Sequence, residues 1–100
     1  MVKFVLLHET QNELVEAIAR YENIDPGLGR RLLDEVISTL GWIQAHPDSA
    51  RLRPPGYHRI NLRTFPYYLP YVVRSDTLWI LAFAHVRRRP LYWIRRRFTG

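Results

Sequence analysis

The sequence contains no cysteine, and none of its apolar runs approaches the roughly 20 residues that a membrane-spanning helix needs. The lack of cysteine excludes disulfide bonds and thiolate metal sites and fits a reducing compartment. The apolar start, Met1 to Leu7, is short and has no small-residue cleavage site after it, so we expect no signal peptide. The four histidines show no metal-ligand spacing, and phosphate-loop glycine patterns are missing. We therefore expect a cytoplasmic protein with no membrane anchor, metal or other cofactor.

Positive charge is concentrated in the second half of the chain. Residues 1–50 carry four cationic and eight acidic side chains, a net charge of −4, whereas residues 51–100 carry eleven arginines and one acidic side chain, a net charge of +10. All the cations but one are arginine, whose forked guanidinium matches carboxylate and phosphate geometry. The sequence predicts a basic surface for an anionic partner, which could be RNA, DNA, an acidic protein or membrane phospholipid.

The length and the hydrophobic patterning predict one α+β domain spanning residues 1–100. We expect a β-α-α-β-β-β order, in which a helical hairpin packs on one face of a small, mostly antiparallel four-stranded sheet. A short basic helix should close the chain. The predicted elements are a strand at 3–7, helices at about 10–24 and 26–45, strands at 57–62, 65–73 and 78–86, and the terminal helix at 91–98.

Helical periodicity and turn residues locate the two long helices. Apolar residues recur at helical spacing in one stripe from Leu14 to Tyr21 and in a second from Leu28 to Ile43. We expect the first helix to open with a capping box, in which the side chains of Thr10 and Glu13 satisfy free backbone N–H groups. Asp25-Pro26-Gly27 should end this helix, and Asp25 can cap the next one.

The strand at 65–73 should alternate between a core face and an opposite face. The predicted core face holds Phe65, Tyr67, Leu69, Tyr71 and Val73. Pro66 and Pro70 cannot donate to a β-ladder, so this strand should pair incompletely or lie near an edge.

Several segments together resemble one known family. In chain order they are Tyr21-Glu22, Gly27-Leu28-Gly29, Ile43-Gln44-Ala45-His46-Pro47, Arg59, Phe65-Pro66-Tyr67, Tyr71, and His85-Val86-Arg87-Arg88-Arg89-Pro90 with Tyr92-Trp93. Their order and spacing resemble the RelE/ParE toxin superfamily, whose closing motif is His-x-x-Arg-x-Pro. The resemblance implies a growth-inhibiting toxin of a type II toxin–antitoxin system, of the plasmid-stabilisation type. It also implies a cognate acidic antitoxin that holds the toxin inactive in a hetero-oligomer, and no membrane partner.

The resemblance leaves two cellular targets open. Members that cut mRNA usually carry an arginine where this sequence has Tyr68, and the family prefers an aliphatic residue where it has Pro70. Both departures count against inherited nuclease chemistry, and Tyr68 favours a ParE-like toxin, which poisons DNA gyrase and needs no cleavage chemistry. The alternative is a RelE-like, ribosome-dependent mRNA endonuclease, so whether the protein is an enzyme stays open.

Cleavage of RNA by its own 2′-hydroxyl needs a proton acceptor, a proton donor and cations that stabilise the phosphorane. The candidates are Arg59, Arg63, Tyr68, His85 and Arg88. Arg59 and Arg63 are four residues apart and should lie on one face of a strand. His85 is chemically suited as a base, although its place on an apolar strand favours a packed, structural histidine.

The basic end of the chain is the predicted contact with the cellular target or with antitoxin carboxylates. The residues expected to make this contact are Arg87, Arg88, Arg89, Tyr92, Trp93, Arg95, Arg96 and Arg97. A different class of function is also possible, a non-toxic module that binds nucleic acid by stacking bases on Tyr57, Phe65, Tyr68, Tyr92 and Trp93.

Overall fold

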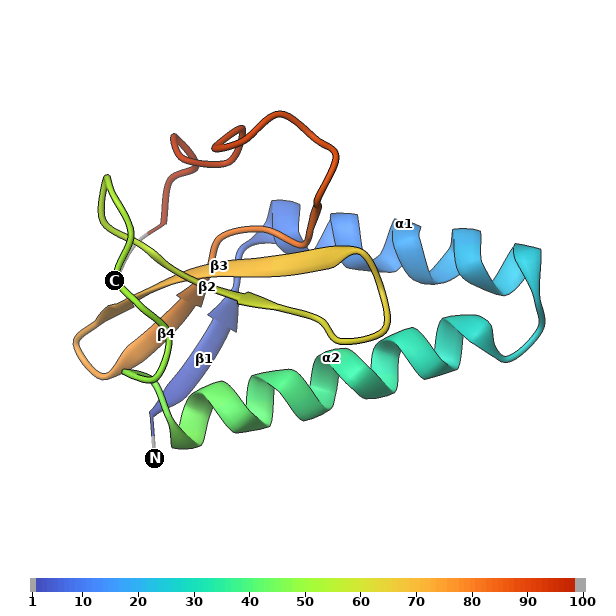
Figure 1. Cartoon of the computed structure of the whole chain (residues 1–100), viewed down its shortest axis with the longest axis horizontal. Coiled ribbons are helices and arrows are strands. Elements are labelled where there is room, and N and C mark those ends of the chain that lie inside the picture. The colour runs from blue at the N-terminus through green and yellow to red at the C-terminus, as the bar shows by residue number, and fades with distance from the viewer. Residues whose placement is uncertain (1, 99–100) are drawn as a thin grey trace.

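The computed structural model describes residues 2–98 and confirms the α+β order (Figure 1). Its elements are β1 (Lys3–Leu6), α1 (His8–Ile24), α2 (Leu28–Ala45), β2 (His58–Asn61), β3 (Tyr67–Arg74), β4 (Thr77–Ile80) and β5 (Ala84–His85). Among the described residues, no helix is long and apolar enough to cross a bilayer.

The N-terminal ends of the two helices are capped differently from the prediction. Helix α1 begins at His8, before Thr10, so the predicted capping box is wrong. The Thr10 hydroxyl is buried and donates a hydrogen bond of 2.8 Å to the Ile80 carbonyl oxygen. Helix α2 is not capped by Asp25, because Gly27 is the N-cap residue, with φ of 94°. The Glu22 carboxylate accepts hydrogen bonds from the N–H groups of Gly27 and Gly29 at 2.9 and 3.0 Å, so a side chain of α1 fixes the start of α2.

The sheet has the strand order β1-β4-β3-β2 and is mostly antiparallel, with β1 and β4 as its parallel pair. It has five strands rather than the expected four, because the predicted strand at 78–86 is interrupted. Ile80 pairs with Tyr71 and Ala84 pairs with Tyr68, so three residues, 81–83, face only two on β3. One of these two is Pro70, which has no N–H to donate. The chain therefore bulges at 81–83 and resumes pairing as β5.

Both faces of the sheet are covered. On one face, Phe65, Tyr67, Leu69 and Tyr71 pack with the helices in the larger core, as predicted. The prediction was wrong for Val73, which lies near the exposed end of β3 and is 37% exposed. On the other face, Tyr68 packs with Trp93 from the C-terminal end of the chain in a second buried cluster. Figure 1 shows this end, in red, on the opposite side of the sheet from α2. The sheet thus lies between the helical hairpin and the residues that follow β5.

We name residues 86–98 the tail. The expected terminal helix is replaced there by consecutive turns over 90–95, with Leu91 at a φ of 64°. The N–H groups of Ile94 and Arg96 donate to carbonyls three residues earlier, at 3.0 and 3.1 Å. Turns suit this segment because they direct Trp93 to the sheet while leaving neighbouring arginines exposed.

Candidate functional site

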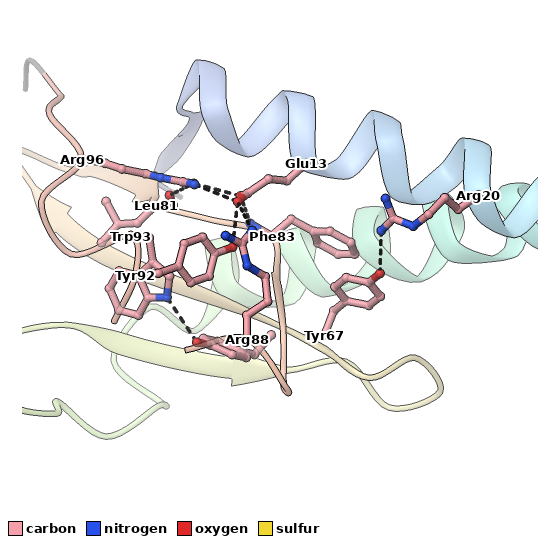
Figure 2. Close-up of polar contacts among 10 residues, drawn as sticks. Glu13, Arg20, Tyr67, Leu81, Phe83, Arg88, Tyr92, Trp93 and Arg96 are labelled. Carbon is pink, nitrogen blue, oxygen red and sulfur yellow. Dashed lines mark hydrogen bonds and ion pairs between the residues drawn. The ribbon is translucent and has the colours of Figure 1, made fainter. Parts of the chain in front are cut away.

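The carboxylate of Glu13 joins three parts of the chain at the surface where the tail leaves the sheet (Figure 2). It accepts a hydrogen bond of 3.0 Å from the Phe83 N–H, which lies in the bulge between β4 and β5. It accepts a second of 2.7 Å from the Tyr92 hydroxyl. Two nitrogens of the Arg96 guanidinium donate hydrogen bonds to it, of 2.9 and 2.7 Å. Helix α1, the bulge and the tail therefore meet at one carboxylate.

The electrostatics of this cluster keep Glu13 ionised. Burial alone would raise the pKa of Glu13, but the hydrogen bonds from Arg96, Tyr92 and the Phe83 N–H outweigh burial and lower it. Burial and the hydrogen bond to Glu13 both raise the pKa of Tyr92, so its hydroxyl stays protonated as a donor. The hydrogen bonds that Arg96 donates to Glu13 are the main cause that raises the pKa of Arg96. The pair is well shielded from solvent, since the Glu13 and Arg96 side chains are 15% and 16% exposed.

Arg88 takes part in the same cluster from its rim. Its guanidinium stacks over the Tyr92 ring at 3.8 Å and lies 3.7 Å from the Glu13 carboxylate. The side chain is 57% exposed, so it is accessible as well as tethered.

Trp93, predicted to contact the target, and Tyr68, predicted as a catalytic candidate, both belong to the interior. Trp93 is 1% exposed, and its indole N–H donates to the hydroxyl of Tyr68, which is itself 4% exposed. Arg59 stacks over the other side of this cluster, 3.8 Å from the centre of the Tyr68 ring. Tyr68 and Trp93 therefore hold the tail against the sheet.

His85 lines a surface groove. Two adjoining hollows of about 360 and 210 Å³ share Arg20, Tyr67 and His85 in their walls, and Glu16 and Arg88 border the smaller one. Arg20 donates to the Tyr67 hydroxyl at 3.1 Å, as Figure 2 shows. The Nδ1 atom of His85 accepts the Arg87 N–H at 3.0 Å. Arg88 is the candidate cation that borders this groove.

The other candidates for RNA cleavage lie elsewhere. Strand β2 ends at Asn61, so the alternation that was expected to align Arg59 with Arg63 stops before Arg63. Arg63 instead lines a hollow beside α2 with Trp42 and Ile60. Arg59 and Tyr68 are on the tail side of the sheet. The described residues thus do not gather the five candidates into one constellation, and their catalytic roles stay predictions.

The remaining tail arginines face solvent. These are Arg87, Arg89, Arg95 and Arg97. Within residues 2–98, the structure records no side-chain hydrogen bond or ion pair for any of them. They are the unengaged cations of the predicted contact segment.

Sequence patterns did not single out Glu13 or Arg20 as site residues. A local signal for Glu13 exists, because it precedes Ala17 by one helical turn and so lies beside the buried stripe of α1. An acidic side chain in that place needs a partner from another part of the fold.

Comparison with known proteins identifies the family. The family model of the ParE toxin of the type II toxin–antitoxin system parDE matches residues 5–90. The chain belongs to the ParE toxin family, and such a system includes an antitoxin as the toxin's partner. Among solved structures, a chain of the chromosomal ParDE toxin–antitoxin system from P. aeruginosa has the same fold, with a TM-score of 0.75 at 17% identity. That match covers 85% of this chain and 96% of the other. No curated protein sequence matches the chain.

Proposed function

We propose that this toxin arrests bacterial growth by binding DNA gyrase, and that an acidic antitoxin neutralises it. The observation that carries the proposal is the tail, a segment that packs against the sheet and carries exposed arginines. Charge-assisted hydrogen bonds from arginine to carboxylates suit a poison that acts by binding. The proposal places the toxin in the cytoplasm, where gyrase acts on DNA.

A binding mechanism agrees better with the site than RNA cleavage does. Tyr68 is buried and engaged by Trp93 and Arg59, so it does not face a substrate. His85 has neither Arg59 nor Arg63 beside it in the groove. The non-toxic nucleic-acid module is disfavoured for a similar reason, because four of the five aromatics that it requires, Tyr57, Phe65, Tyr68 and Trp93, are buried.

The antitoxin should be recognised through charge as well as apolar contact. The +10 second half of the chain attracts an acidic partner, which speeds association and discriminates against neutral partners. We expect expression of the toxin alone to arrest growth and coexpression with the cognate antitoxin to restore it.

The decisive experiment compares two cellular readouts after expression of the toxin alone. We expect loss of gyrase supercoiling activity and no new cleavage sites by primer extension on ribosome-bound mRNA. His85→Ala should retain toxicity at matched soluble levels, because a poison that works by binding needs no general base. If the parent toxin cuts mRNA and a folded His85→Ala protein does not, the protein is the endonuclease and the gyrase proposal is wrong.

A further inference from the structure

The tail arginines fall into two groups that the sequence does not distinguish. Arg88 and Arg96 turn toward α1, where both lie within 4 Å of the Glu13 carboxylate. The exposed group consists of Arg87, Arg89, Arg95 and Arg97. In each run of three consecutive arginines, the middle one contacts Glu13 and its two neighbours do not, although Arg88 is 57% exposed and only Arg96 is largely buried.

Glu13 is well placed to set this pattern. It projects from α1, and its bond to the Phe83 N–H ties the same carboxylate to the bulge that Pro70 causes in the sheet. The carboxylate is thus held by α1 and by the bulge, independently of its contacts with the tail. Arg96 adds a hydrogen bond of 3.1 Å to the Leu81 carbonyl in the same bulge, so the tail is attached to the sheet as well as to the helix.

We propose that Glu13 is a positioning residue, which fixes the tail so that Arg87, Arg89, Arg95 and Arg97 together form the surface that contacts an acidic protein patch on the target. The proposal rests on the proposed function, because it takes the tail as the target contact. It goes beyond the family match, which ends at residue 90 and so does not cover Tyr92, Arg95, Arg96 or Arg97.

The charges around the cluster favour an acidic protein over nucleic acid as the partner. Glu9 and Glu16 are exposed on α1, on the side that the tail crosses. Glu9 acts electrostatically on Arg96, and Glu16 borders the groove with Arg88. A continuous phosphate backbone laid along the tail would meet these carboxylates, whereas discrete carboxylates on a protein can match the four arginines separately.

If Glu13 positions the tail, removal of its carboxylate should both loosen the tail and weaken the contact of the tail with the target. A mobile tail has to be ordered again on binding, and each immobilised long side chain adds to that cost. For Glu13→Gln we therefore expect inhibition of gyrase supercoiling to weaken by about tenfold or more, with amide hydrogen exchange in residues 88–98 faster by about tenfold. Exchange in the core of α1 and in β3 should stay at the parent rate.

Two further variants separate positioning from contact. Glu16→Gln is the matched control, since it removes the same charge one turn along α1 without touching the hydrogen bonds to the tail, so tail exchange should stay at the parent rate and inhibition should not weaken. The paired variant Arg95→Gln, Arg97→Gln should weaken inhibition by about tenfold or more while tail exchange stays at the parent rate. If Glu13→Gln proves unstable, Arg96→Gln tests the same anchor and leaves Glu13 bonded to Tyr92 and Phe83.

Each outcome decides a separate point. A tail that loosens in Glu13→Gln with inhibition within twofold of the parent would overturn the positioning role, and a tail that does not loosen would overturn the anchor itself. Binding of a short DNA duplex that is lost in the paired arginine variant would overturn the assignment to an acidic protein. If the parent toxin does not inhibit gyrase, the proposed function fails, and growth arrest measured beside tail exchange then decides the role of Glu13.

Discussion

The indole N–H of Trp93 donates a hydrogen bond of 3.2 Å to the hydroxyl of Tyr68, across the face of the sheet that the helices leave uncovered. The Tyr57 ring completes the contact in an edge-to-face arrangement with Trp93, with the ring centres 4.8 Å apart. A segment that reads in sequence as a basic extension is therefore part of a second core. Its arginines are presented by a packed structure and not by a free chain end.

Replacement of Trp93 should lower the free energy of unfolding more than any exposed substitution. Trp93→Ala is expected to cost about 3–5 kcal/mol, because it removes a large buried aromatic and leaves a cavity. Trp93→Phe should cost less, about 1–3 kcal/mol, mainly from the unpaired Tyr68 hydroxyl. Urea unfolding measures both. Trp42→Ala is the control, since Trp42 is 46% exposed and its loss should cost well under the Trp93→Ala value. Equal losses at the two tryptophans would rule out a packed tail.

Alanine at the two glycines of α2 should have opposite effects on stability. A Cβ at Gly29 would lie 2.7 Å from the Ile18 carbonyl oxygen and 3.0 Å from the Glu22 carboxylate, so the helices would have to separate. We expect Gly29→Ala to destabilise the protein by about 1–3 kcal/mol. A Cβ at Gly41 meets nothing within 4 Å, and Gly41→Ala should stabilise the helix by about 0.5–1 kcal/mol. Thermal unfolding compares the two variants, and a stabilised Gly29→Ala protein would contradict the close helix contact.

The turn between β3 and β4 offers a gain in stability. Ser75 and Asp76 both have positive φ, 51° and 61°, which suits the turns that match the twist of a hairpin but disfavours most side chains. Asp76→Gly relieves this conformation and should raise the free energy of unfolding by about 0.5–1 kcal/mol. Asp76→Ala, which keeps a Cβ and loses the carboxylate, should not show the gain. Denaturant unfolding of the two variants distinguishes backbone relief from loss of charge.

The order of the elements could be predicted because it depends on local patterns. The alternation of Tyr67, Leu69 and Tyr71 and the stripe of α2 each bury one face, so residues a few positions apart are enough to reveal them. The gap in the last strand was partly foreseeable from Pro70, since proline was expected to disturb pairing on β3. Its consequence falls on residues 81–83 of the neighbouring strand, which a local pattern does not identify.

The candidate site was less predictable, because its contacts join distant parts of the chain. Glu13 and Arg96 are 83 residues apart, and the expected capping box assigned Glu13 to its own helix instead. The tail was expected to be a helix that contacts the target, but Trp93 finds a partner on the sheet 25 residues earlier. Which arginines are held and which are exposed follows only from these long-range contacts.

The stability added by Glu13 should disappear in acid. Its pKa is lowered in the folded protein, so the stabilisation is full above the ordinary carboxyl value of 4.5 and is lost as the pH falls through the lower folded value. At pH 7, Glu13→Gln should cost about 2–3 kcal/mol, because it removes charge-assisted hydrogen bonds from Arg96 and Tyr92. The difference between parent and variant should shrink below pH 4.5.

Glu35 does not disturb this comparison. Burial would raise the pKa of Glu35, but hydrogen bonds from Thr64 outweigh burial and lower it. Both proteins keep Glu35, so its contribution cancels. Urea unfolding from pH 7 to pH 3, with Glu16→Gln as the control, measures the effect. A difference that stays constant over this range would mean that the charge of Glu13 does not stabilise the tail.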